Sequence, residues 1–348
     1  MTASRLNIAL DQDGLVLPDS GHIAVLRATS QFDHNGIARQ RLRLFNSFRP
    51  EFDRLDALDF TVAADFSGHY ATSMVEITRS KAETLGLVAM ATMATDPGGI
   101  VLVDGAKTDG IDSVLKHCKA LFQPISVVAK SHGKLFWFTR PENLPLALTE
   151  WRAYLTAKRN SAGYLSAPGM FSPDKADPGS TLLAAHFDDR LAGEVADLGA
   201  GWGWLADQAL QRSDAISRLD LYEAEKTALE AARANIADTR AEFHWADVAK
   251  LDITARYDAV ISNPPFHQGR AAEPDLGAAF ITKAAAILKP KGQLWLVANR
   301  QLPYESVLAE CFAAIRPLEE THHFKVILAS RPLSGSSRRL QRNSRHAR

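Results

Sequence analysis

One sequence pattern occurs twice in this 348-residue chain, and the repetition constrains the fold more than any other feature. In both copies a Pro-x-Gly turn precedes an apolar run, and the spacing between matching residues then stays constant as far as a cysteine. The matched segments are 70–74 with 257–261, 97–103 with 290–297, 113–115 with 306–308, Cys118 with Cys311, and 132–141 with 323–332. We therefore expect two copies of one fold; the alternative is a coincidence between ordinary strand and turn patterns.

Size and composition are those of a folded protein with room for two domains. Hydrophobic residues make up 46% of the chain and charged residues 23%, and each half is long enough to bury its own core. No stretch reaches the roughly 18 uninterrupted apolar residues of a membrane span, and the N-terminal residues show no secretory signal pattern. The two cysteines are too few for a disulfide framework or a zinc site. We expect a cytoplasmic monomer without a metal or a membrane partner.

Apolar runs of strand length alternate with helical patterns in the second half. Strands are expected at 194–198, 218–222, 257–262, 293–297 and 325–329, and helices at 204–212 and 226–236. This alternation predicts an α/β fold of the Rossmann-like type, a mostly parallel sheet with helices on both faces. Because ligands bind such sheets at the carboxyl ends of the strands, the residues that follow the strands are candidates for a site. A stretch with glycine and proline at 159–169 is expected to join the two copies.

The first expected strand of the second half leads into the glycine-rich segment DLGAGWG. Gly199, Ala200 and Gly201 allow the backbone to turn tightly and to approach a ligand closely. Dinucleotide-binding loops are similar, but their pattern requires another glycine where this chain has Trp204. Asp197 precedes the glycines, as does the acid that holds the amino-acid part of the cofactor in S-adenosylmethionine-dependent methyltransferases. The segment therefore favours a methyltransferase pocket, with an oxidoreductase as a distant alternative.

Two further acids follow expected strands and extend this pocket. Glu223 can accept hydrogen bonds from both ribose hydroxyls of a bound cofactor. Asp220 is its rival, but the spacing to the following helix favours Glu223. Asp247, next to Ala246, stands after a third strand, where methyltransferases carry an acid that accepts the adenine amino group beside a capping backbone N–H. Each acid alone would be an ordinary solvated side chain. In register with the glycine turn, they indicate S-adenosylmethionine as the cofactor.

The most specific motif is Asn263-Pro264-Pro265-Phe266, directly after the expected strand 257–262. An exocyclic amine of a nucleobase is a poor nucleophile, because its lone pair is delocalised into the ring. The side-chain carbonyl of Asn263 and the backbone carbonyl of Pro264 can accept its two N–H bonds and aim the lone pair at a methyl group. The two prolines stiffen the turn, and Phe266 can stack on the base. These four residues are the expected catalytic set, and Asn263 is also expected to border the cofactor.

Together these motifs resemble the ribosomal RNA small-subunit methyltransferase C family and the related large-subunit methyltransferase G, which methylate guanine at N2. The similar segments are 168–172, 177–183, 263–269, 297–304 and 324–326. The resemblance implies S-adenosylmethionine as cofactor and a guanine of ribosomal RNA, free or in a ribosomal subunit, as substrate. The small subunit is the favoured source of that RNA.

The resemblance also implies a degenerate N-terminal copy, which repeats the fold without binding cofactor, supports folding and holds RNA. Residues 76–79 (EITR) stand where the second copy has the Asn-Pro-Pro-Phe motif, and the strand 22–26 leads into RATS, without glycines. We therefore expect a degenerate domain at 1–160, a catalytic methyltransferase domain at 165–332 and a basic, disordered tail at 333–348. The six arginines within 331–348 can track phosphates or remain solvated.

Three other functions remain open at this point. The same four-residue motif also serves methyltransferases that act on adenine N6 of DNA or RNA, and others that act on a glutamine side-chain amide of a translation factor. The glutamine interpretation predicts a small helical N-terminal domain in place of an α/β repeat. A non-enzymatic alternative is an inactive RNA-binding assembly factor, although the second copy keeps every element that a methyltransferase requires.

Overall fold

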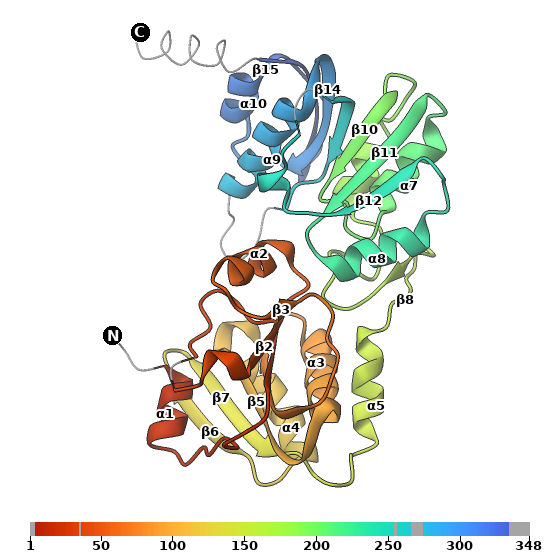
Figure 1. The fold of residues 1–348 in the computed structure, drawn as a ribbon. Helices are drawn as coiled ribbons and strands as arrows, with labels where there is room; N and C mark the ends of the chain where they lie inside the picture. The colour runs from red at the N-terminus through yellow and green to blue at the C-terminus, as the bar shows by residue number, and fades with distance from the viewer. Residues whose placement is uncertain (1–3, 35, 254–255, 266–273, 334–348) are drawn as a thin grey trace, which may run out of the picture. The chain divides into compact units, whose positions relative to one another are not determined.

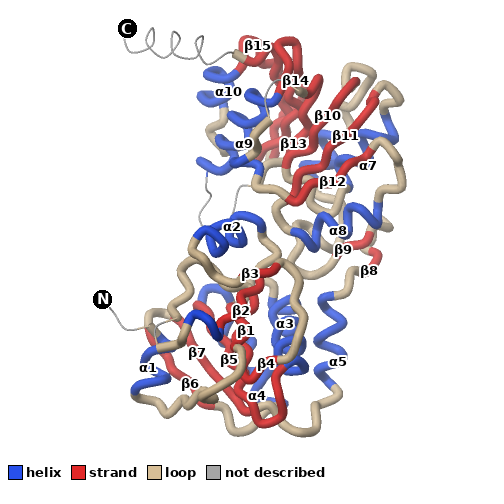
Figure 2. Tube along the Cα trace, in the orientation of Figure 1, coloured by secondary structure: helices blue, strands red, loops and turns tan. Residues whose placement is uncertain are grey.

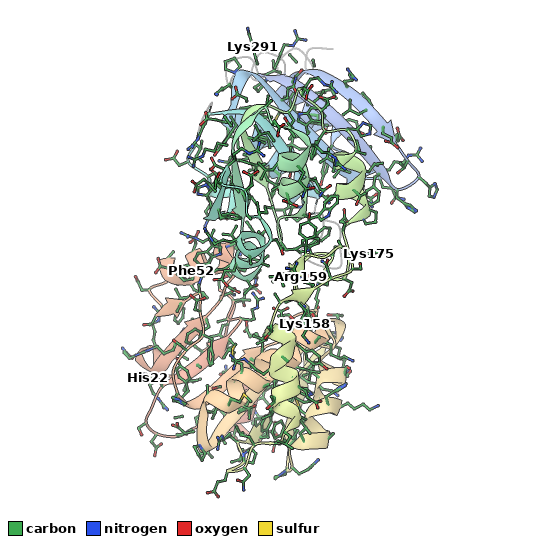
Figure 3. All side chains as sticks on the ribbon, turned by 90° about the vertical axis from the view of Figure 1, so that its right-hand side faces the viewer. His22, Phe52, Lys158, Arg159, Lys175 and Lys291 are labelled. Carbon is green, nitrogen blue, oxygen red and sulfur yellow. The ribbon has the colours of Figure 1, made fainter. Side chains whose placement is uncertain are left out.

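The computed structural model describes residues 4–34, 36–253, 256–265 and 274–333 of the chain. The expected basic tail lies outside these residues from 334 onward. The chain divides into two compact units, unit 1 with Met1–Lys158 and Ala167–Met170, and unit 2 with Arg159–Ser166 and Phe171–Arg348. It first passes from one unit to the other between Lys158 and Arg159, both labelled in Figure 3.

Unit 1 contains a seven-stranded sheet in the order β3-β2-β1-β4-β5-β7-β6 (Figure 1). Its strands are β1 (Ile23–Leu26), β2 (Leu42–Phe45), β3 (Val62–Ala63), β4 (Tyr70–Glu76), β5 (Thr95–Ala106), β6 (Ser126–Lys130) and β7 (Gly133–Thr139). Neighbours from β3 to β5 along this order pair in parallel, whereas β7 pairs antiparallel with both β5 and β6.

Unit 2 repeats this sheet strand for strand, in the order β12-β11-β10-β13-β14-β16-β15. Its strands are β10 (Gly193–Leu198), β11 (Ile216–Glu223), β12 (Ala241–Trp245), β13 (Tyr257–Ser262), β14 (Leu288–Asn299), β15 (Phe312–Glu320) and β16 (Phe324–Pro332). Neighbours from β12 to β14 are parallel, and β16 is antiparallel to β14 and β15. The two sheets therefore share one topology, which confirms the predicted repeat of a mostly parallel α/β fold. A separate two-stranded sheet pairs β8 (Lys158–Arg159) with β9 (Leu165–Ser166).

Helices pack on both faces of the unit 2 sheet (Figure 2). The α-helices of the chain are α1 (Arg5–Asp11), α2 (Arg49–Ala57), α3 (Lys81–Ala94), α4 (Ile111–Leu121), α5 (Ala147–Arg152), α6 (Pro178–Ala184), α7 (Trp204–Arg212), α8 (Lys226–Asn235), α9 (Pro274–Ile287) and α10 (Glu305–Cys311). One apolar cluster joins the unit 2 sheet to α6, α7 and α8, and a second joins the opposite face to α9 and α10. Side chains along β10 alternate between the clusters, with Val195 in the first and Ala196 and Leu198 in the second.

The expected elements of unit 2 are present, with small differences at their ends. Helix α7 has the predicted bounds, and α8 ends one residue before the predicted end. Strand β15 is not among the predicted strands, because Pro317 within its sequence argues against a central strand. The strand lies at the edge of the sheet and its register shifts between Pro317 and Glu319, and both features tolerate proline. No described helix is both long and apolar enough to cross a membrane.

Candidate active site

The glycine-rich turn joins the central strand β10 to helix α7. Gly199, Gly201 and Gly203 have positive φ angles of 79°, 55° and 87°, which favour glycine over a residue with a Cβ. The backbone N–H groups of Gly199 and Ala200 both donate to the Tyr222 carbonyl, at 2.9 and 3.1 Å, and tie the turn to the end of β11. A Cβ at Gly201 would meet no heavy atom of the described residues within 4 Å. The turn is therefore open to a ligand at Gly201.

Asp197, near the end of β10, is almost completely buried, with 1% of its surface exposed. Neither of its carboxylate oxygens has a hydrogen-bond partner among the described residues. Burial raises the pKa of Asp197 well above its ordinary value, and the nearby charge of Glu223 raises it further. A buried acid of this kind requires a partner that donates hydrogen bonds or carries positive charge. The ammonium group of an amino acid provides both, so Asp197 fits the amino-acid end of S-adenosylmethionine.

Glu223 is the last residue of β11, at the strand tip where the sequence places a ribose-binding acid. Its Oε2 accepts the backbone N–H of Gly201, and its Oε1 accepts that of Glu225, both at 2.8 Å. Burial raises the pKa of Glu223. The two backbone contacts hold the carboxylate against the glycine turn in a fixed orientation.

Asp220, the rival of Glu223 in the sequence, is fully buried within the strand. Its carboxylate accepts hydrogen bonds from Tyr257 Oη at 2.6 Å and Arg218 Nε at 2.9 Å, and lies 3.0 Å from His244 Nε2. Burial alone would raise the pKa of Asp220, but these partners hold it well below its ordinary value. Asp220 is therefore committed to a structural network and does not lie at the strand end.

Asp247 comes two residues after β12, the strand that pairs with β11. Its Oδ1 accepts the Ala249 N–H at 3.0 Å and caps the short 3-10 helix η4 (Val248–Lys250). The N–H of Ala246 donates to the Glu223 carbonyl at 3.0 Å. The N–H of Ala246 is therefore already hydrogen-bonded within the protein, and this bond holds Ala246 beside the tip of β11. The acids expected for ribose and adenine therefore lie at the ends of two adjacent strands.

The turn that begins at Asn263 lies beside the glycine turn. It follows β13, the strand next to β10. The Cδ atom of Pro265 lies 3.9 Å from the position that a Cβ would take at Gly199. The fold thus brings Asn263, Pro264 and Pro265 to the strand ends that form the pocket. Phe266, the fourth residue of the motif, lies outside the described residues.

The sequence did not single out Asp177 or Ser180 as functional residues, yet both contact Asn263. Asn263 Nδ2 donates to Asp177 Oδ2 and to Ser180 Oγ, at 2.9 Å in each case. Asp177 is also the N-cap of α6, because its Oδ2 accepts the Ser180 N–H at 2.8 Å. The Asp-Pro pair before an apolar run is a helix-start signal that could have located the cap. Nothing in the sequence pattern connects that cap to Asn263.

Strand pairing shows which residues of unit 1 occupy the positions of the pocket. Strand β1 lies between β2 and β4 as β10 lies between β11 and β13, so the two registers can be superposed residue by residue. The corresponding pairs are Val25 and Asp197, Arg27 and Gly199, Asn46 and Glu223, and Glu76 and Asn263. Each of these four site residues of unit 2 is therefore replaced by a different residue type in unit 1.

The polar residues at these positions of unit 1 bind other residues of the same unit. Arg27 keeps the left-handed backbone of the glycine turn, with a φ of 59°. Its guanidinium forms an ion pair with Glu83 and donates to Ser47 Oγ at 3.0 Å. Glu76 Oε2 accepts the backbone N–H of Thr29 at 2.9 Å, and burial raises the pKa of Glu76 to about 8. Unit 1 thus retains the fold with internal contacts at the strand ends, as expected of a degenerate copy.

Comparisons with known proteins give evidence that does not depend on this geometry. A family model described as "Methyltransferase small domain" matches residues 162–328. The chain is 32% identical to the ribosomal RNA small subunit methyltransferase C of Escherichia coli over 254 residues, which cover 71% of this chain and 70% of the relative. It is 31% identical to that of Pseudomonas paraeruginosa over 271 residues (76% and 80%), and 29% identical to that of Psychromonas ingrahamii over 271 residues (73% and 74%).

A solved structure extends the similarity to both copies of the fold. A 16S rRNA N2 methyltransferase from T. thermophilus, in complex with AdoMet and guanosine, is similar with a TM-score of 0.74 and 24% identity. The match covers 91% of this chain and 90% of that one. The chain is more than 30% identical to two of these relatives and covers over two thirds of the length of each. The chain therefore belongs to the ribosomal RNA small subunit methyltransferase C family.

Proposed function

We propose that unit 2 transfers a methyl group from S-adenosylmethionine to the exocyclic N2 amine of a guanine in ribosomal RNA of the small subunit. The observation that carries the proposal is the position of the Asn263 turn: Pro265 Cδ lies 3.9 Å from the point that a Cβ would take at Gly199. A base held by the Asn263 turn is then adjacent to a cofactor held by the glycine turn. The names of the relatives support ribosomal RNA as the substrate.

The residues at the strand ends fit the cofactor group by group. Asp197 is a buried acid with both oxygens unpartnered among the described residues, and it would accept the ammonium group. Glu223 would accept the ribose hydroxyls, and Asp247 beside Ala246 would accept the adenine amine. The backbone at Gly199, Ala200 and Gly201 permits close approach. When bound, S-adenosylmethionine supplies a methyl group on a positively charged sulfur, which reacts readily with nucleophiles.

The contribution of the substrate turn is positioning. The Oδ1 of Asn263 and the backbone carbonyl of Pro264 would accept the two N–H bonds of the guanine amine and direct its lone pair at the methyl group. Pro264 and Pro265 have restricted φ angles, so the acceptors keep their orientation without an ordering cost at each turnover. Such positioning accounts for large rate accelerations when a reaction needs no strong base. Phe266 would stack on the base, a contact worth about 1–3 kcal/mol in nucleic-acid complexes.

The proposed role of unit 1 is to support folding and to hold RNA. Its pocket positions carry Val25, Arg27, Asn46 and Glu76, which bind within the unit or lack the chemistry for a cofactor. A chain that acts on ribosomal RNA is expected to work in the cytoplasm. Deletion of unit 1 should then reduce the affinity for RNA more than the affinity of unit 2 for the cofactor.

The test is transfer of a labelled methyl group to ribosomal RNA, supplied free and in subunits, followed by digestion to nucleosides. The expected product is N2-methylguanosine, and the Asn263→Ala variant serves as the negative control. Label recovered as N6-methyladenosine would assign the turn to adenine. Label found only on protein would assign it to a glutamine amide. Either result would overturn the guanine proposal.

A further inference from the structure

We infer that Asp177 and Ser180 are positioning residues that fix the amide of Asn263 with its carbonyl toward the substrate amine. We also infer that the charge of Asp177 makes that carbonyl a stronger acceptor. The inference rests on the proposed function, since it needs an N–H-donating substrate at Asn263. It adds two residues, from a helix distant in sequence, to the substrate turn.

The orientation of the Asn263 amide follows from the chemistry of its partners. A carboxylate can only accept hydrogen bonds, so the atom of Asn263 that lies 2.9 Å from Asp177 Oδ2 must be the nitrogen. The second contact, 2.9 Å to Ser180 Oγ, uses the other N–H of the same nitrogen. With both N–H groups engaged on one side, Oδ1 is the group that the amide presents on the other. Reversing the amide would place its oxygen against the carboxylate.

The platform that holds Asp177 and Ser180 is rigid. Asp177 Oδ2 also accepts the Ser180 N–H at 2.8 Å, which closes the first turn of α6. Pro178 occupies the first turn of that helix, where its fixed φ suits the helical backbone. Ser180 is 8% exposed. Helix α6 itself packs into the apolar cluster that contains β10, so the platform and the glycine turn share one core.

The charge of Asp177 matters because the amine becomes positive as it reacts. The new N–C bond forms while the sulfonium S–C bond breaks, and the nitrogen then loses one proton to water. A carboxylate that accepts from the Asn263 amide polarises it and increases the negative charge on Oδ1. The polarised oxygen interacts more strongly with the amine as positive charge develops than before reaction, so its effect should appear in kcat.

An exchange of the two side chains tests the orientation directly. Asn263→Asp places a second carboxyl group against Asp177, and two carboxyl groups at this distance share one proton, which they release at a higher pH than an isolated carboxyl group does. The single variant should therefore transfer methyl groups at acidic pH and lose about tenfold in rate per pH unit above the pKa of the shared proton. The double variant Asp177→Asn with Asn263→Asp restores one donor amide and one acceptor carboxylate. The amide nitrogen at position 177 then donates to position 263, and the amide oxygen takes over the Ser180 N–H that Asp177 Oδ2 accepts in wild type. It should regain transfer at neutral pH with a flat profile.

Further variants separate positioning from helix capping. Asp177→Asn keeps a good N-cap and can keep the same oxygen contacts without the charge, so kcat should fall roughly tenfold while cofactor affinity stays unchanged. Ser180→Ala should lower kcat by a smaller factor. The matched control is Ser80→Ala, which removes the N-cap of α3, a 3.3 Å contact to the Glu83 N–H, without touching the site. Its kcat should stay within about twofold of wild type.

The outcomes distinguish this inference from the proposed function. If wild type methylates guanine but the double variant transfers no more methyl at neutral pH than Asn263→Asp does, while both bind cofactor, the inference is wrong. Full kcat in Asp177→Asn would also overturn the role of the charge. If wild type transfers no methyl group to guanine, the proposed function fails. In that case the unfolding temperatures still test whether Asp177 contacts residue 263. If it does, Asn263→Asp should lose stability as pH rises, and the double variant should not.

Discussion

Neutralising Asp197 should change stability and cofactor binding in opposite directions. The carboxyl is buried and its pKa is raised well above the ordinary 3.8, so the folded, cofactor-free protein retains a proton that the unfolded chain releases. Stability then falls as pH rises, by about 1.4 kcal/mol per pH unit between the unfolded and the folded pKa. Asp197→Asn removes this dependence. At pH 7 the variant should gain at most about 4 kcal/mol, or roughly 10 °C in Tm for unit 2.

The same substitution should weaken cofactor binding. A hydrogen bond to a charged partner contributes about 1.5–3 kcal/mol, and its loss corresponds to an affinity roughly 10- to 150-fold lower. Thermal unfolding at several pH values between 5 and 8 measures the gain in stability. Calorimetric titration with S-adenosylmethionine and with S-adenosylhomocysteine measures the loss in affinity. The stabilised protein should therefore be the weaker enzyme.

Asp220→Asn is the matched control, because Asp220 lies on the neighbouring strand and is equally inaccessible to solvent. Its pKa is held below the ordinary value by hydrogen-bonded partners, so its contribution to stability is present above the unfolded pKa and lost as pH falls. Breaking such a buried network should cost about 3–5 kcal/mol at pH 7. If Asp197→Asn were destabilised like Asp220→Asn, or bound cofactor as tightly as wild type, the reasoning for Asp197 would be refuted.

Three further substitutions probe the substrate turn, the degenerate copy and the glycine turn. Asn263→Ala should abolish methyl transfer while cofactor affinity, measured by titration, stays largely intact; an active variant would contradict the proposed acceptor role. Glu76→Gln should remove part of the pH dependence of the unfolding free energy of unit 1, because the folded carboxyl keeps its proton up to a pKa of about 8. The stability that the variant gains over wild type, measured by urea unfolding, should grow between pH 4.5 and 8 to about 5 kcal/mol. Gly203→Ala should lower the stability by about 1–3 kcal/mol, because a Cβ there would lie 2.9 Å from Ile236 Cδ1 and 3.0 Å from Ala232 Cβ, at a φ of 87°. An unchanged unfolding temperature would show that α7 can move to accommodate the methyl group.

Local patterns predicted the elements of unit 2 where the signals agreed. The bounds of α7 were predicted because three glycines precede the helix and a strong apolar period runs through it. The repeat predicted the topology of the first sheet, since two copies of one pattern must bury the same faces. The spacing to the following helix favoured Glu223 over Asp220 already in the sequence, but the buried hydrogen-bond network that engages Asp220 is seen only in the structure. The edge strand β15 was missed because Pro317 is tolerated only at an edge, which the sequence does not identify.

Contacts between distant segments were beyond prediction for a physical reason. Asp177 and Asn263 are 86 residues apart, and their hydrogen bond depends on where α6 packs against the sheet. Helix α6 has seven residues, too short for a convincing period of its own. Its cap is recognisable as a helix start and as nothing more. The partner of a catalytic side chain can therefore be hidden in a segment whose sequence shows only a local structural role.

The two units together separate what the fold requires from what the chemistry requires. Both sheets have the same strand order, and the buried Cys118 and Cys311 occupy matching helices, so folding has preserved the core positions of both copies. The differences fall at the carboxyl ends of the central strands. Val25 in place of Asp197 shows that the sheet accepts an apolar side chain where unit 2 buries an acid without a partner among the described residues. Since folding does not demand that acid, and its burial opposes folding, its presence is best explained by a ligand that it binds.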